Sequence, residues 1–142
     1  MTTAVVALKI DELWIGLDAS LVLEVLGEIP WVPLAGVAAA VPGVLAWRGR
    51  AIAVVDLANA AGLGSASSPT RRRRALVVKF GGDTLALPVD DVREVQQIDA
   101  ESVQSSHATR LRHSSTEVDI NGLTLPLLDS SALMASLIRT EP

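Results

Sequence analysis

The sequence contains no cysteine and no tyrosine, and aromatic residues make up only 3% of it. Without cysteine, the chain has no disulfide, no thiolate nucleophile and no cysteine-based zinc site. It also lacks a phosphate-binding loop, a dinucleotide-binding fingerprint and the residue order of a serine hydrolase triad. These absences remove the commonest sequence signatures of an enzyme, and we expect no catalytic residues, no cofactor and no metal site.

Long apolar runs and an excess of basic residues are missing as well. No apolar stretch approaches the roughly 20 residues that a membrane-spanning helix needs, and the start lacks the basic and apolar regions of a signal peptide. The formal net charge is −4, whereas nucleic-acid binding depends on clustered lysine and arginine. We therefore expect a soluble cytoplasmic protein that neither inserts into a membrane nor binds nucleic acid.

Aliphatic residues dominate what is present. Of the 142 residues, 49% are hydrophobic and 20% are charged. This composition is typical of one compact domain, or of two very small lobes that share a core. Short runs of β-branched and aliphatic residues favour strands, so the predicted fold class is all-β with short helices.

An internal repeat is the clearest pattern in the sequence. A shift of about 70 positions aligns the first strands with a later stretch, and a shift of about 73 aligns two later hairpins. Identical pairs are Lys9 and Lys79, Leu17 and Leu87, Val22 and Val92, Glu24 and Glu94, Val25 and Val95, Gly49 and Gly122, and Asp56 and Asp129. We interpret the repeat as a duplicated β unit.

The repeat predicts two β-lobes that pack face to face around one apolar core. The first lobe is expected at about residues 1–66 and the second at about residues 71–129, with a small polar linker at residues 64–70 between them. Apolar residues at helical spacing indicate a closing helix within residues 130–142, which we assign to the first lobe. The whole chain, residues 1–142, is expected to be a single domain.

Aspartates at the ends of equivalent strands allow two interpretations. Asp56 and Asp129 are candidates for an acid/base pair, which needs two carboxylates at a set separation. The repeat favours a cap for the helical turn that follows each of them. A further short turn of helix is expected after Ser20, and its repeat-equivalent after Asp90 or Asp91.

Six short motifs occur in a fixed order along the chain. The first half contains Val22-Leu23-Glu24-Val25, Gly43-Val44-Leu45-Ala46-Trp47-Arg48-Gly49 and Ile52-Ala53-Val54-Val55-Asp56-Leu57. The second half contains Leu87-Pro88-Val89, Val92-Arg93-Glu94-Val95 and Leu127-Leu128-Asp129. In order and spacing, over about residues 5–138, these motifs resemble the CheW-like adaptors that link bacterial chemoreceptors to their histidine kinase.

The resemblance implies two five-stranded SH3-like barrels and a non-catalytic adaptor. Its partners would be the cytoplasmic tip of a methyl-accepting chemoreceptor and the regulatory domain of a CheA-like histidine kinase. Receptor contacts would lie in an apolar groove between the barrels and near the arginine of the Leu-Arg-Gly turn. Carried over by motif, the partner-binding residues are Val22, Glu24 and Arg48, with Trp47 beside them in place of the family's usual leucine.

Two departures from the family pattern concern the second half. Glu117 stands where the family prefers valine after glycine, and the stretch from Val95 to Asp129 is shorter than usual. Both affect the middle strand of the second barrel. They leave open that the chain is a reduced adaptor that keeps only one of the two contacts.

The run Arg71–Arg74 offers an alternative function as a module that binds nucleic acid or an anionic surface. The run has no aromatic platform and the rest of the chain is acidic, so we favour a solvated end of the linker. His107 and His113 lack a nearby acidic set and make a poor metal site.

The three tryptophans and the turn arginines complete the candidate residues. Trp14 alternates with apolar residues, so we expect it to face outward or between the lobes. Trp47 is expected to be partly buried, whereas Trp31, between two prolines, has no clear preference. At the Arg48-Gly49-Arg50 turn, we expect a partner contact for Arg48 and solvation for Arg50.

Overall fold

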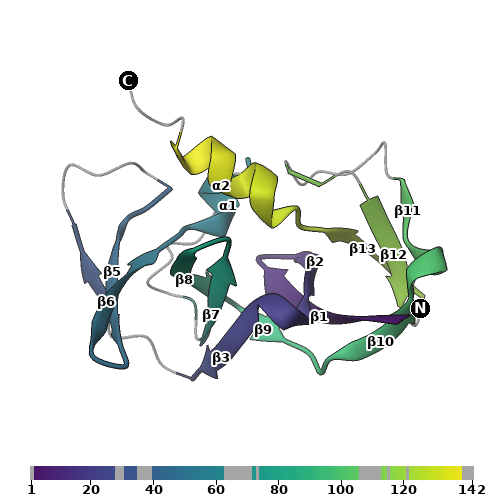
Figure 1. Ribbon diagram of the computed structural model, residues 1–142, viewed down its shortest axis with the longest axis horizontal. Coiled ribbons are helices and arrows are strands. Elements are labelled where there is room, and N and C mark those ends of the chain that lie inside the picture. The colour runs from purple at the N-terminus through teal and green to yellow at the C-terminus, as the bar shows by residue number, and fades with distance from the viewer. Residues whose placement is uncertain are drawn as a thin grey trace.

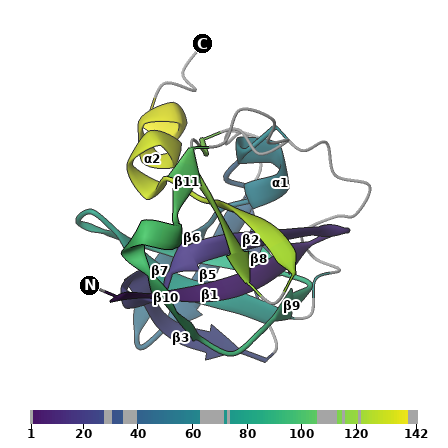
Figure 2. The same cartoon turned by 90° about the vertical axis from the view of Figure 1, so that its right-hand side faces the viewer.

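The computed structural model describes residues 2–27, 31–34, 40–62, 72, 74–105, 113–114, 116–120 and 122–138. They form two β-sheets side by side along the long axis of the molecule, with both α-helices along one edge (Figures 1 and 2). The predicted all-β fold with short helices is therefore confirmed.

We call each sheet, together with the side chains that pack on its inner face, a lobe. Lobe A contains β1 (Thr2–Ile10), β2 (Leu13–Asp18), β9 (Asp91–Val92), β10 (Gln96–Asp99), β11 (Gln104–Ser105), β12 (Thr116–Ile120) and β13 (Leu123–Leu127). Lobe B contains β3 (Val22–Leu26), β4 (Trp31–Pro33), β5 (Gly43–Trp47), β6 (Arg50–Val54), β7 (Arg74–Phe80) and β8 (Asp83–Val89). The helices are α1 (Leu57–Ala60), α2 (Ser130–Ile138) and the 3-10 helices η1 (Ala19–Leu21) and η3 (Ala100–Ser102).

The two lobes have the same strand order. Among the described residues, the longer strands run β10-β1-β2-β13-β12 in lobe A and β3-β7-β8-β6-β5 in lobe B. In each lobe a parallel pair joins two antiparallel hairpins, β1–β2 to β12–β13 and β7–β8 to β5–β6. The short strands β4, β9 and β11 add to this five-stranded plan.

The halves of the chain exchange their first hairpins. Hairpin β1–β2 pairs with strands from the second half, and hairpin β7–β8 pairs with strands from the first. The expected division into residues 1–66 and 71–129 therefore does not follow the sheets. The connection explains why: only η1 separates β2 from β3, and β3 pairs with β7 instead of folding back onto β1. Neither half builds a complete sheet without the other.

The registers preserve the repeat that the sequence contains. Shifts of 70 and 73 positions convert strand pairs of one lobe into strand pairs of the other. Equivalent pairs are Leu8–Val92 and Val78–Val22, Val5–Gln96 and Ala75–Leu26, and Gly16–Leu127 and Ala86–Val54. The predicted duplication is confirmed, and β12 is present despite Glu117, in the register that β5 has with β6.

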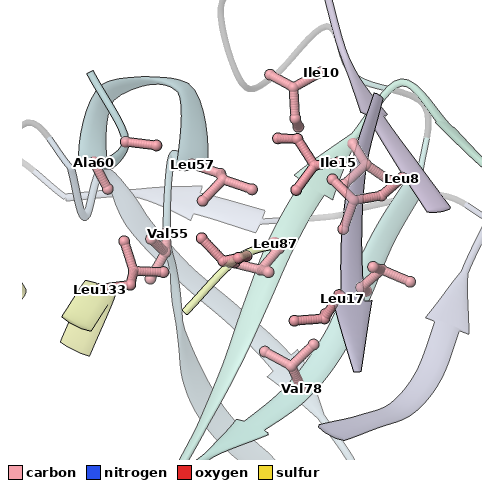
Figure 3. Packing of buried hydrophobic residues seen from close by; sticks show 14 of the residues in the cluster. Leu8, Ile10, Ile15, Leu17, Val55, Leu57, Ala60, Val78, Leu87 and Leu133 are labelled. Carbon is pink, nitrogen blue, oxygen red and sulfur yellow. The ribbon is translucent and has the colours of Figure 1, made fainter. Parts of the chain in front are cut away.

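A shared apolar core lies between the lobes. It receives Leu8, Ile15 and Leu17 from one exchanged hairpin, Leu87 from the other, and Leu133 from α2 (Figure 3). The exchanged hairpins are buried on both faces, because their other sides fill the interiors of the lobes. Burial on both faces explains why β1 is apolar at successive positions from Ala4 to Leu8 and does not alternate with polar residues there.

This double burial corrects the expectation for Trp14. The side chain of Trp14 is partly buried and packs against the interior cluster of lobe A, not between the lobes, and the charged groups of Lys9 and Arg93 lie over its ring. Alternate residues of β2 face two apolar environments, the shared core at Ile15 and the lobe interior at Trp14. Strand alternation therefore does not separate buried from exposed positions here.

The helix caps follow the repeat. Asp56 Oδ1 accepts the Asn59 N–H at the start of α1, and Asp129 Oδ1 accepts the Ala132 N–H at the start of α2. The capping interpretation is confirmed for both aspartates. The expected turn after Ser20 is different: Asp18 caps η1 and β3 begins at Val22.

Of the other two helix predictions, one is wrong and one is confirmed. Asp91 begins a short strand, β9, so no helical turn follows it. The closing helix is present as α2, and residues 139–142 lie outside the described residues. Its Leu133 belongs to the shared core, and α2 contacts α1 and β7.

Gly43 is a point of close approach in lobe B. A Cβ on Gly43 would overlap the Val32 carbonyl oxygen and the Trp31 ring. We expect Gly43→Ala to lower the free energy of unfolding by about 2 kcal/mol. Gly82→Ala is the matched control, because a Cβ there meets open space, and it should stay within about 0.5 kcal/mol of the parent. Equal denaturation midpoints for the two variants would contradict this account.

Candidate functional site

The tip of the β5–β6 hairpin forms the centre of the candidate site. A two-residue turn joins the strands, with φ of +48° at Arg48 and +75° at Gly49. Two positive φ values are what a type I′ hairpin turn requires. Glycine adopts this conformation freely, whereas at Arg48 it costs roughly 1 kcal/mol. A non-glycine residue in this position suggests a use for its side chain beyond the turn.

Glu24 on β3 brings this tip into a cluster of three side chains. Glu24 Oε1 accepts the indole N–H of Trp47 at 3.2 Å and pairs with an Arg48 guanidinium nitrogen at 3.2 Å. The Arg48 guanidinium carbon lies 4.8 Å from the Trp47 ring centroid, a cation–π arrangement. Three of the four sequence-predicted residues, Glu24, Trp47 and Arg48, therefore meet, and we call them the tip cluster.

The Arg48–Glu24 ion pair of the tip cluster is accessible and contributes little to the stability of the fold, whereas Trp47 also packs against the interior cluster of lobe B. The Arg48 side chain is 69% exposed and the Glu24 side chain 38%, and exposed pairs of this kind contribute about 0 to 1 kcal/mol. Glu24 and Trp47 fix the direction of the guanidinium. Its contact with Glu24 uses one of five N–H donors, and the others can bind a carboxylate with paired hydrogen bonds.

Val22 lies apart from the tip cluster. Its side chain is partly buried and packs against the shared core. Leu23 and Val25, on the other face of β3, are instead 44% and 45% exposed. The expectation of a helical turn hid these two residues, because only a strand places them together on one face. Val95, the repeat-equivalent of Val25, is also exposed.

Arg72 corrects the expectation of a solvated arginine run. Its side chain is only 1% exposed, and one guanidinium nitrogen lies 3.2 Å from Asp11 Oδ1 and 2.5 Å from Asp90 Oδ2. Arg74, at the start of β7, is exposed, and Arg71 and Arg73 lie outside the described residues. Arg72 is buried beside the turns that bear Asp11 and Asp90.

The carboxyl group of Asp56 has a raised pKa. Burial raises the pKa of its carboxyl above the ordinary value of 3.8, and the Asn59 N–H and the Arg72 charge only partly offset this effect. The folded protein then holds this proton more tightly than the unfolded chain does. The contribution of Asp56 to the free energy of unfolding therefore falls as pH rises from 3.8 through the raised pKa.

Asp56→Asn tests this linkage, because asparagine is an equally good cap and does not titrate. Relative to the parent, the free energy of unfolding of the variant should increase between about pH 3 and about pH 7. Urea denaturation across that range measures the difference. A difference that does not change with pH would contradict the shifted titration.

Among the described residues, no group of three or more histidines, aspartates and glutamates is placed to hold a metal ion. His113 is partly buried, and His107 lies outside the described residues. In the part of the chain that the structure covers, no helix is both long enough and apolar enough to span a bilayer.

Comparison with known proteins decides the family. The model of the CheW-like domain matches residues 4–137 of this chain. The chain belongs to the CheW-like domain family. No curated protein sequence matches the chain.

A solved structure supports the fold of this CheW-like chain. The crystal structure of the scaffolding protein TtCheW from Thermoanaerobacter tengcongensis is similar to it, with a TM-score of 0.79 and 24% sequence identity. The likeness covers 89% of this chain and 88% of that one. It confirms the fold that the motifs implied, two SH3-like barrels with a C-terminal helix. Membership of the family supports the role of a chemotaxis scaffold in general.

Proposed function

We propose that this CheW-like chain is a non-catalytic cytoplasmic adaptor that couples a methyl-accepting chemoreceptor to a CheA-like histidine kinase. The observation that carries the proposal is the tip cluster, in which Glu24 and Trp47 direct the exposed Arg48 guanidinium. These are residues that the family motifs assign to receptor binding.

The receptor surface would combine a charge with an apolar strip. Arg48 would bind a carboxylate on a helix of the receptor tip, and Leu23 and Val25 would cover apolar side chains beside it. The hairpin tip and β3 both lie along the lower edge of lobe B in Figure 1. A buried apolar centre next to one directed ion pair is a common interface design.

The kinase surface would lie on a different strand. Val32 on β4 is 59% exposed and Leu34 follows it at 43%. Strand β4 ends the strand order of lobe B, and exposed edge strands readily accept a partner. Since β12 is formed despite Glu117, lobe A gives no reason to expect the loss of a contact.

The burial of Arg72 counts against the alternative function, a module that binds nucleic acid or an anionic surface. Binding to phosphates needs accessible guanidinium groups, whereas the Arg72 side chain pairs internally with Asp11 and Asp90. At least one of the four arginines of the run is therefore unavailable.

Titration calorimetry with each partner tests the proposal. The probes are the signalling-tip fragment of a receptor and the regulatory domain of a kinase, both from the organism that encodes this chain. The proposal expects measurable affinity for both probes. Binding to one alone would identify a reduced adaptor, and binding to neither would overturn the proposal.

A further inference from the structure

One end of the interior of lobe A is open to solvent. A pocket of about 340 Å³ is present there among the described residues. Val5, Leu127 and Leu128 give it an apolar lining, and Asp18 and Asp129 give it two carboxylates. These three apolar side chains belong to the lobe interior or the shared core, so the pocket opens onto packed structure.

The repeat shows what fills the same place in lobe B. There the ring of Trp31 lies directly over Gly43, where a Cβ would overlap two of its ring carbons. Trp31 pairs with Leu45 on β5 and packs against the interior cluster of lobe B. The chain thus closes this end of lobe B with its own flat side chain.

Lobe A carries a smaller side chain at the position equivalent to Trp31. Strand β11 pairs with β12 as β4 pairs with β5, which makes Val103 the counterpart of Trp31 and Thr116 the counterpart of Gly43. Val103 packs on the lobe A cluster but is much smaller than an indole. Thr116 also lines the pocket, so the pocket borders the place that a flat side chain occupies in the other lobe.

The charges of the pocket select the ligand. Asp18 accepts hydrogen bonds from the Ser20 N–H and hydroxyl, and Asp129 accepts one from the Ala132 N–H. Each carboxylate has further lone pairs available to a donor, and among the described residues no basic side chain lines the pocket. The ligand that matches is flat, cationic and carried on an apolar stem, which describes arginine.

We propose that this pocket binds an arginine side chain presented by a partner polypeptide. The guanidinium meets Asp18 and Asp129, and the methylene stem covers Val5 and Leu127. The site is separate from the tip cluster, which belongs to lobe B, and it does not depend on the receptor contact proposed above.

Nuclear magnetic resonance titration with N-acetyl-arginine methylamide tests the proposal on the full chain. Chemical shifts of the amides of Thr116, Leu127 and Leu128 are expected to move with saturation. The citrulline analogue has the same shape without the charge, and it should bind at least tenfold more weakly. No shift at these amides, or equal binding of the two compounds, would overturn the proposal.

Two variants distinguish the pocket from general charge attraction. Val103→Trp reproduces the closure of lobe B and should abolish the arginine-specific shifts. Asp18→Asn combined with Asp129→Asn keeps both caps and should weaken binding at least tenfold, a readout that remains if Val103→Trp fails to fold. Parent-like binding by the double variant would overturn the proposal. Neither variant changes Arg48, so this result is independent of receptor binding.

Discussion

Replacing Arg72 with methionine should lower the free energy of unfolding by about 2 to 4 kcal/mol. Methionine fills much of the same space but leaves the carboxylates of Asp11 and Asp90 without their shared cation. The Asp90 carboxylate also accepts the backbone N–H of Asp11 at 2.5 Å, so both carboxylates lie at the turn of hairpin β1–β2 beside the same guanidinium. Chemical denaturation of the full chain measures the loss.

The expected loss is large because of where Arg72 lies. Asp11 is in the turn of hairpin β1–β2, and Asp90 directly follows hairpin β7–β8. Arg72 therefore joins the two exchanged hairpins at the segment that connects the halves. Arg74→Met is the control, because Arg74 is exposed, and it should change the free energy by no more than about 0.5 kcal/mol. Equal losses for Arg72→Met and Arg74→Met would contradict this role.

Reversing the charge of Arg48 should have the largest effect on partner binding. Arg48→Glu places a carboxylate beside Glu24 and opposite the carboxylate expected on the receptor helix. We expect the affinity for the receptor tip to fall roughly thirtyfold, which corresponds to about 2 kcal/mol. Titration calorimetry with the receptor-tip fragment gives the affinity, and circular dichroism verifies that the variant is folded.

Arg50→Glu is the matched control for this prediction. Arg50 lies two residues away on the same hairpin, is equally solvated, and makes no contact with Glu24 in the described structure. It should bind the receptor tip within about twofold of the parent, since rim charges contribute little. If Arg48→Glu binds as well as Arg50→Glu does, the tip cluster is not the receptor site.

Much of the fold could be predicted from sequence pattern. The capping roles of Asp56 and Asp129 and the closing helix depend on spacing between nearby residues, and the repeat depends on matching two stretches about 70 positions apart. The meeting of Glu24 with Arg48 was indicated by family motifs, because those motifs carry information about distant contacts. Composition alone would not have predicted that Glu24 on β3 contacts the tip of the β5–β6 hairpin.

The exchange of hairpins could not be predicted from pattern. Hairpins β1–β2 and β7–β8 have the same apolar alternation and even the same registers, so the sequence does not say which half each one joins. Only the short connection through η1 decides this. The same exchange accounts for two other unpredicted features. Arg72 is buried between the two exchanged hairpins, and Trp14 belongs to a hairpin that has apolar surroundings on both faces.

The exposure of Leu23 and Val25 on β3 could not be predicted from the sequence for a different reason. The motif Val22-Leu23-Glu24-Val25 has apolar residues at both strand and helix spacing, and the pairing with β7 decides for a strand. A strand then directs Leu23 and Val25 to solvent and Glu24 toward Trp47. The apolar part of the candidate site therefore became visible only with the sheet.

Recruitment of the kinase to receptor-bearing vesicles tests the adaptor proposal most directly. Vesicles carrying the receptor signalling domain are sedimented with the CheA-like kinase, with and without this chain, and the kinase in the pellet is measured. The account predicts that the chain raises the pelleted kinase severalfold and that Arg48→Glu removes most of this increase. The same amount of pelleted kinase with and without the chain would contradict it.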